Sequence, residues 1–148
     1  MGGARSVGCR IISLREQVNR VERVRRMCVI VAGASRDRAK FGYRAVRAYA
    51  KRGHDVYAVN PGATSIEGLP CFALVMEVKG PVDRLLVYLP AAAALGVLRE
   101  GAARNDVAEV WPNPGVDDPR VVQEAAVLGL KAIRGCAIID IGESPSSY

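Results

Sequence analysis

The sequence predicts an α/β fold, with an open parallel β-sheet of about five strands and helices on both faces. Apolar, β-branched runs alternate about four times with segments whose apolar residues recur at helical spacing. The first such run, residues 27–32, contains no charged side chain, which is typical of a strand buried on both faces of a parallel sheet. The length of 148 residues suits one domain around one core.

Local signals define the elements of the first half of the chain. Ser13 and Glu16 form a capping box that begins a helix, and Gly53 is a natural end for a later one. Pro70 fits the start or the edge of a strand. The expected elements are an Arg-rich helix over 13–26, a strand over 27–32, a helix over 42–52, a strand over 55–59 and a short edge strand over 69–72.

In the second half, Asp117 or Asp118 caps a helix that has Pro119 near its first position. The expected elements are a strand over 82–89, an Ala-rich helix over 91–104, a strand over 107–111, a helix that ends at Gly129 and a short strand over 131–133. This order is that of a three-layer, Rossmann-like fold. We therefore divide the chain into an N-terminal extension (1–26), a Rossmann-like domain (27–140) and a frayed C-terminal tail (141–148).

The composition indicates a folded globular protein, because 50% of the residues are hydrophobic and 24% are charged. No apolar run approaches the roughly 18 residues that a membrane helix needs, so we expect a cytoplasmic protein that binds no membrane. The four cysteines and the single histidine, His54, lack the spacing of a metal site, and we expect no metal. His54 follows Gly53 in a helix-to-strand turn, where we expect it to be exposed and non-catalytic.

The net charge is +6, and the excess of Lys and Arg lies in residues 1–26 and 36–52. The second segment adjoins a glycine-containing turn, so the local field favours an anionic ligand there. Only 5% of the residues are aromatic, which leaves few side chains on which the bases of a nucleic acid could stack. The charge pattern therefore favours a small anionic ligand over a nucleic acid.

Ligands of open parallel α/β sheets bind beyond the carboxyl ends of the strands. The turn Gly33-Ala34-Ser35 follows the first predicted strand. Gly33 permits close approach of the backbone, Ser35 offers a hydroxyl, and the next helix presents its positive N-terminus. Arg36 and Lys40 add positive charge. This combination predicts a site for a pyrophosphate group.

Familiar nucleotide-binding motifs are absent from this turn. The sequence lacks the GxGxxG fingerprint, and Asn60 stands where an acidic residue would bind the ribose of NAD. It also lacks a P-loop, which disfavours ATP hydrolysis. NADP stays an alternative, because basic side chains can meet its 2′-phosphate.

Several segments carry a joint pattern, namely residues 29–37, 40–43, 56–61, 66–70, 80–83, Pro90, 114–116, 129–130 and Cys136. In this order they resemble the small stand-alone coenzyme A-binding proteins. The domain of those proteins is similar to the CoA-binding domain of the succinyl-CoA synthetase α-subunit. The resemblance implies a Rossmann-like fold and coenzyme A as the ligand.

The resemblance also implies a role for each matching residue. In these roles the backbone amides of Gly33, Ala34 and Ser35 hold the diphosphate, Arg36 and Lys40 neutralise phosphate charge, Phe41, Gly42 and Tyr43 line the ligand's path, Val59, Asn60 and Pro61 border the nucleotide, and Leu89 and Pro90 pack on the adenine side.

Two classes of function follow. No Ser-His-Asp triad or Cys-His pair is visible among the motifs, which favours a protein that binds CoA, free or acylated, over an enzyme. The alternatives are an NADP-dependent oxidoreductase and a non-catalytic subunit of an acyl-CoA synthetase-like enzyme. A homodimer is the commonest assembly for such a chain.

Overall fold

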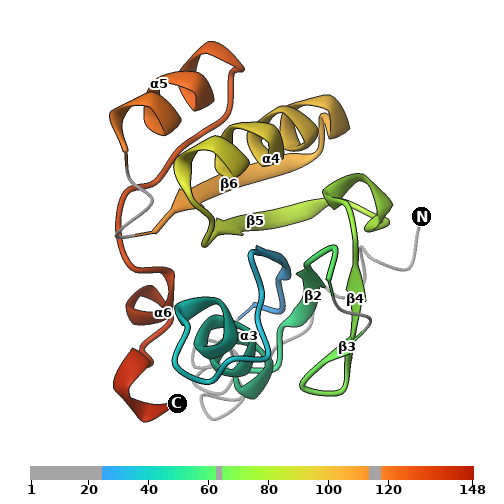
Figure 1. The fold of residues 1–148 in the computed structure, drawn as a ribbon, viewed down its shortest axis with the longest axis vertical. Coiled ribbons are helices and arrows are strands. Elements are labelled where there is room, and N and C mark those ends of the chain that lie inside the picture. Colours follow the sequence, from blue (N-terminus) through green and yellow to red (C-terminus); the bar gives the residue numbers. More distant parts are fainter. Residues whose placement is uncertain (1–24, 63–64, 114–117) are drawn as a thin grey trace, which may run out of the picture.

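The computed structural model describes residues 25–62, 65–113 and 118–148. Six strands form one sheet in the order β3-β4-β2-β1-β5-β6 (Figure 1). The strands are β1 (Cys28–Ala32), β2 (Asp55–Val59), β3 (Ser65–Ile66), β4 (Leu69–Phe72), β5 (Val82–Val87) and β6 (Val107–Pro112). All adjacent pairs except β3–β4 are parallel. The chain runs from β1 to β2 on one side and later to β5 on the other, so the strand order reverses between β1 and β5.

Strand β1 lies at the centre of the sheet because both of its faces are apolar. Val29, Ile30, Val31 and Ala32 have no exposed surface. Successive side chains of a strand point to opposite faces. Val29 and Val31 therefore belong to one core, and Ile30 and Ala32 to the other.

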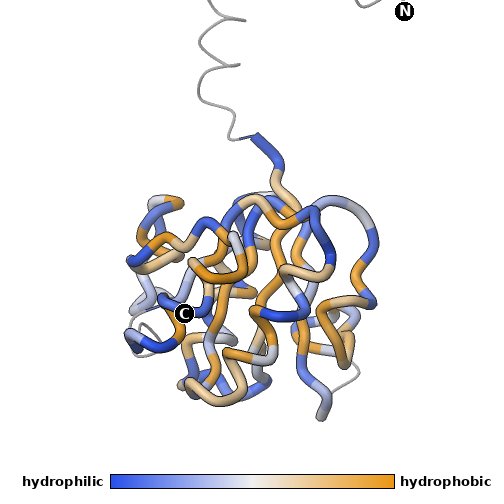
Figure 2. Tube along the Cα trace, turned by 90° about the horizontal axis from the view of Figure 1, so that it is seen from above, coloured by the Kyte–Doolittle hydropathy of each residue, from blue (hydrophilic) through white to orange (hydrophobic). Residues whose placement is uncertain are grey.

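Helices cover both faces of the sheet, which confirms the predicted three-layer α/β fold. Helices α3 (Phe41–Lys51) and α6 (Ala137–Asp140) cover one face, and α4 (Ala91–Arg104), α5 (Pro119–Val127) and the 3₁₀ helix η1 (Val75–Glu77) cover the other (Figure 1). Hydrophobic segments run through the interior and hydrophilic turns surround them (Figure 2). In the part of the chain that the structure describes, no helix has the length and apolar character to cross a membrane.

The edge next to β4 differs from the prediction. β4 occupies the predicted residues 69–72, but it is not the edge strand, because β3 pairs with it in antiparallel orientation. Glu67 (φ 52°) and Gly68 (φ 75°) join the two strands. Two consecutive positive φ values give the tight hairpin turn that suits twisted strands. The sheet thus has six strands where the sequence predicts about five.

The predicted strand over 131–133 is wrong. Only Ala132 pairs with β6, through a single bridge to Val110. The amide of Val110 donates to the carbonyl of Lys131 at 2.8 Å, and the amide of Ile133 donates to Val110 at 2.8 Å. The chain then turns at Gly135 (φ 147°), so no further pair forms.

The C-terminal tail is packed, so the prediction of a frayed end is wrong. Residues 145–147 form a 3₁₀ helix, η2 (Pro145–Ser147), which contacts α3. Glu143 forms ion pairs with Arg52 (2.5 Å) and Lys51 (3.6 Å), and it accepts a hydrogen bond from the hydroxyl of Tyr148 (2.6 Å). Those contacts tie the end of the chain to α3.

Other expectations have mixed outcomes. Asp118, rather than Asp117, caps α5, because its carboxylate accepts the amide of Arg120 at 2.8 Å. Residues 13–24 of the predicted helix over 13–26 lie outside the described residues, and the two described ones, Arg25 and Arg26, are not helical. The division of the chain into an extension, a domain and a tail stays a prediction.

Candidate functional site

A cavity of about 590 Å³ lies beyond the carboxyl ends of β1, β2, β4 and β5, next to the point where the strand order reverses. Nine of the predicted site residues line it, namely Gly33, Ala34, Ser35, Lys40, Val59, Asn60, Pro61, Leu89 and Pro90. The remaining lining residues are Ala73, Leu74, Tyr88, Ala93, Val97 and Glu100. The structure thus brings together segments that are distant in the sequence, since Gly33 and Glu100 are 67 positions apart.

The turn after β1 depends on two glycines. Gly33 has a φ of 88°, and a Cβ atom there would overlap the carbonyl oxygen of Tyr88. A Cβ atom on Gly42 would overlap the carbonyl oxygen of Gly33. Helix α3 therefore packs directly against the turn, and this close approach explains why both positions need glycine.

Backbone donors of the turn after β1 adjoin the cavity. The amide of Gly33 still belongs to the sheet, since it donates to Val59 at 3.1 Å. Within the described residues, the next two amides, those of Ala34 and Ser35, donate to no acceptor. Helix α3 begins directly after Lys40 and α4 directly after Pro90, so two positive helix ends adjoin the cavity. Free amides and helix N-termini are the usual elements of a phosphate site.

Asn60 holds the floor of the cavity together. Its side-chain amide donates to the carbonyl of Ala34 at 2.8 Å, and its side-chain oxygen accepts the amide of Gly62 at 2.8 Å. Its backbone amide donates to Phe72 at 2.9 Å. One side chain therefore fixes the turn after β1 relative to the turn after β2. The predicted contact of Asn60 with a nucleotide stays a prediction, and the structure shows the positioning role.

Charge in the lining is sparse. Among the described lining residues, Lys40 is the single cationic side chain and Glu100 is the single acidic one. Arg36 does not line the cavity, because its guanidinium donates to the carbonyl of Ser65 at 3.1 Å. The positive character of the site therefore comes mainly from the backbone and from Lys40.

Three further predicted residues lie beside the cavity and do not line it. Phe41 is about half exposed and stacks with the guanidinium of Arg44, 5.4 Å from the ring centre. Tyr43 is buried, and Gly42 lies under the turn. Their contact with a ligand stays a prediction.

The apolar wall extends beyond the predicted Leu89 to Leu74, Ala93 and Val97, which were not predicted. Leu89, Ala93 and Val97 follow one another at intervals of four residues, so the last two share one face of α4. This spacing, counted onward from Leu89, was the available signal. Tyr88 also lines the cavity, but its side chain packs against the core that α3 and α6 cover, where its hydroxyl is buried without a partner among the described residues and burial raises its pKa. That hydroxyl therefore stays protonated at neutral pH.

In the described part of the chain, the lining offers binding groups and no pair of nucleophile and base. Ser35 is the one hydroxyl at the turn, and its oxygen accepts the amide of Asp37 at 3.0 Å. His54, the single histidine of the chain, does not line this cavity. The arrangement can hold an anionic group beside an apolar one.

The fold recurs in solved structures. A conserved hypothetical protein from Pyrococcus furiosus is 25% identical, with a TM-score of 0.69 and coverage of 77% of this chain and 98% of that one. A protein from Thermus thermophilus is 24% identical, with a TM-score of 0.72 and coverage of 86% and 96%. The dinucleotide-forming acetyl-coenzyme A synthetase 1 of Ca. Korarchaeum cryptofilum is 26% identical, with a TM-score of 0.61, and the match covers 72% of this chain and 25% of that one.

A comparison with curated proteins found no match. A family model described as a CoA binding domain matches residues 28–142. The matched segment runs from β1 through α6 and includes every residue that lines the cavity. Because the match spans most of the sequence, this chain belongs to the CoA-binding domain family.

Proposed function

We propose that the protein binds coenzyme A, free or acylated, in the cavity at the carboxyl ends of the strands, and that it has no catalytic machinery of its own. The observation that carries the proposal is the combination of free amides at Ala34 and Ser35 with Lys40 and an apolar wall in one cavity. Membership of the CoA-binding domain family supports it.

The chemistry of the ligand matches the two halves of the cavity. The diphosphate of CoA would accept hydrogen bonds from the amides of Ala34 and Ser35, and Lys40 would neutralise part of its charge. The adenine would pack on Leu89 and Val97, because a flat apolar ring gains free energy when it leaves water. Arg36 would reach a phosphate only after releasing the carbonyl of Ser65.

We also place the protein in the cytoplasm. The described cysteines, Cys28, Cys71 and Cys136, are all free thiols. Burial raises the pKa of the first two, so these thiols stay protonated and weakly nucleophilic. Free thiols are typical of a reducing compartment.

The likeness to a quarter of an acetyl-CoA synthetase favours a second candidate, a CoA-binding subunit that works with a catalytic partner.

Thermal shift and calorimetry with CoA, NADP and ATP at equal concentrations test the proposal. At about 100 times its dissociation constant, a specific ligand stabilises the fold by about 2.7 kcal/mol. We expect this shift with CoA, and Lys40→Ala should weaken binding roughly tenfold by removing one charge-assisted hydrogen bond. Lys79→Ala is the matched control, because Lys79 is exposed and does not line the cavity.

Three results would contradict the proposal. A shift with NADP and none with CoA would identify a different nucleotide. Equal loss of affinity in Lys40→Ala and Lys79→Ala would show that the ligand responds only to net charge. Hydrolysis of an acyl-CoA by the purified chain would show catalysis that the proposal excludes.

A further inference from the structure

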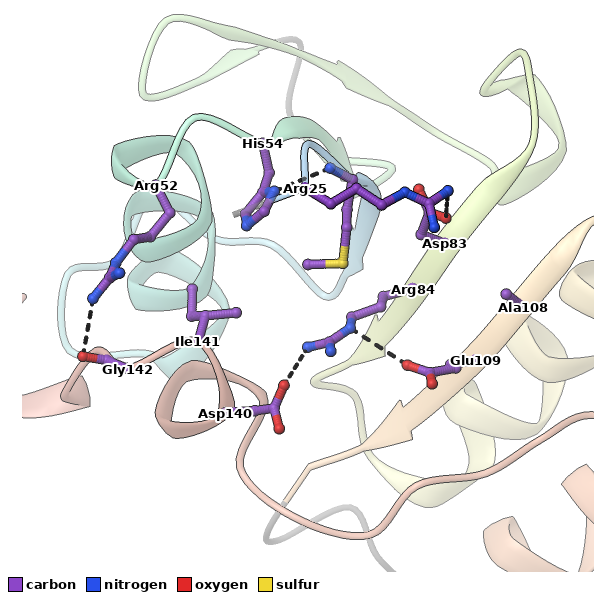
Figure 3. A pocket seen from close by; sticks show the side chains of 11 residues that line it. Arg25, Arg52, His54, Asp83, Arg84, Ala108, Glu109, Asp140, Ile141 and Gly142 are labelled. Atoms are coloured by element: carbon purple, nitrogen blue, oxygen red, sulfur yellow. Dashed lines mark hydrogen bonds and ion pairs between the residues drawn. The ribbon is translucent and has the colours of Figure 1, made fainter. Parts of the chain in front are cut away.

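A second cavity, of about 510 Å³, lies at the opposite rim of the sheet, where the strands begin (Figure 3). Its walls come from the start of β2, from β5 and β6, and from the region of α6. The proposed CoA site uses none of these residues. Its lining is charged, with three arginines and three acidic residues.

His54 belongs to this cavity, and the prediction that it is exposed is wrong. Only 6% of its surface is exposed. Its Nδ1 accepts the backbone amide of Met27 at 3.1 Å. A neutral imidazole that accepts at Nδ1 carries its proton on Nε2. Among the described residues that Nε2 has no hydrogen-bond partner, although it is buried. His54 therefore lines the cavity with a side chain that still has an unused donor.

Arg84 supplies further donors from β5, which is separated from β2 by β1 in the sheet (Figure 3). Its Nη1 pairs with Asp140 (2.8 Å) and donates to the hydroxyl of Tyr49 (3.0 Å), and its Nε pairs with Glu109 (3.4 Å). Its guanidinium stacks on Trp111, 4.7 Å from the ring centre. These contacts hold the group in place, and within the described part of the chain Nη2 has no partner. An arginine fixed in this way is suited to a planar oxyanion.

The acidic groups of the wall are largely engaged already. Asp83 accepts the amide of Cys28 at 2.8 Å and lies 3.7 Å from Arg25. Glu109 accepts from the indole of Trp111 at 3.2 Å, in addition to its pair with Arg84. The described groups of the cavity wall that still lack hydrogen-bond partners are therefore mainly donors. Because the charges of the wall balance, a monoanion fits better than a dianion.

We propose that this cavity is a second binding site, which takes the carboxylate group of a small metabolite between Nε2–H of His54 and Nη2 of Arg84. The carboxylate would satisfy both donors at once. The inference is independent of the CoA site, because the two cavities share no lining residue.

Two native reporters allow a direct test, since the chain has one histidine and one tryptophan. Sodium acetate is titrated into the full chain, with sodium chloride keeping the ionic strength constant. The His54 imidazole is followed by NMR and Trp111 by fluorescence. We expect a saturable downfield shift of the His54 Nε2 proton and a saturable change in Trp111 emission with the same midpoint. His54→Phe should weaken the fluorescence response at least tenfold, whereas Lys79→Ala should leave it unchanged.

Several outcomes would overturn the proposal. One is the absence of a saturable response to acetate in either reporter. Another is a response to inorganic phosphate as strong as that to acetate, which would contradict the preference for a carboxylate. A third is an unchanged acetate response in a folded His54→Phe protein. If His54→Phe does not fold by circular dichroism, the NMR titration of the native chain decides alone.

Discussion

The two rims of the sheet hold cavities of similar size, about 590 and 510 Å³, but they are built differently. At the carboxyl rim the free polar groups are backbone amides, and Lys40 is the only cation among the lining residues that the structure describes. At the amino rim the polar groups are side chains, and most of them are already paired with one another. The backbone thus prepares the first cavity for an anion, whereas the second depends on the donors that its ion pairs leave over.

The direction of the helices explains this difference. In a parallel α/β fold every helix that follows a strand begins at the carboxyl rim and ends at the amino rim. Helices α3 and α4 therefore point their positive ends at the first cavity. Their last turns carry Lys51 and Arg104, which suit the negative helix ends. The amino rim must balance those cations with carboxylates, such as Glu143 and Asp106.

The largest expected loss of stability is that of a glycine-to-alanine substitution at the carboxyl rim, compared with the same substitution at the amino rim. Gly33 and Gly53 have nearly equal φ values, 88° and 84°, but only Gly33 lies against another backbone atom, the carbonyl of Tyr88. We expect Gly33→Ala to lower the free energy of unfolding by about 2–4 kcal/mol, from overpacking and an unfavourable φ together. Gly53→Ala should cost about 1 kcal/mol, from φ alone. Urea denaturation measures both.

The difference between the two variants isolates the close approach at the carboxyl rim. Gly96→Ala is the control for the substitution itself, because Gly96 lies inside α4 with free space around it, and it should be neutral or stabilising. Equal losses for Gly33→Ala and Gly53→Ala would contradict the role given to the turn. Gly33→Ala should also abolish the CoA-dependent thermal shift.

A smaller effect is expected in the polar network of the amino rim. The hydroxyl of Tyr49 donates to the buried carbonyl of Ala137 at 2.8 Å and accepts from Arg84. Tyr49→Phe leaves that carbonyl unpaired, so we expect a loss of about 1–3 kcal/mol in the free energy of unfolding. Tyr57→Phe is the control and should change it by less than about 0.5 kcal/mol. Equal effects in urea denaturation would show that the hydrogen bond contributes nothing specific.

The sequence predicted the carboxyl rim better than the amino rim. Gly33, Asn60 and Pro90 are turn residues that separate strands from helices. Their place at the strand ends follows from the order of the elements. His54 also follows a turn glycine, but in the structure its Nδ1 accepts the amide of Met27, which lies 27 positions away in the sequence. No local pattern encodes such a contact. The two-residue strand β3 is too short for a periodic signal.

Arg36 shows the same limit at the carboxyl rim. Its position after Ser35 predicted a phosphate contact, which stays a prediction, and in the structure its guanidinium donates to the carbonyl of Ser65, which begins the hairpin. Lys40 keeps the predicted place, because it directly precedes α3 and the start of that helix fixes its backbone. A side chain's position is thus predictable where the backbone of an element fixes it, and not where a distant segment captures its charged end.

The smallest expected effect is the pH dependence that His54, at the amino rim, gives to the free energy of unfolding. Burial, together with the positive charges of Arg84 and Arg52, lowers the pKa of His54 in the folded chain, and these effects outweigh Asp55 and Asp83, which raise it. In the unfolded chain the pKa is about 6.5, so below this pH the unfolded state binds a proton that the folded state does not. The free energy of unfolding should therefore fall as the pH decreases from about 6.5 towards the lowered pKa, by at most about 1.4 kcal/mol per pH unit.

Urea denaturation between pH 5 and 7.5 measures this slope, and His54→Phe should remove it, because the single histidine of the chain is then absent. The raised pKa values of Cys28 and Cys71 keep those thiols protonated throughout this range, so they add no slope. Lys40→Ala, at the carboxyl rim, should leave the slope as in the native chain. If the free energy of unfolding varies with pH in the same way in the native chain and in His54→Phe, the acid sensitivity comes from carboxylates. The burial of a neutral His54 at the amino rim would then not contribute to the pH dependence of stability.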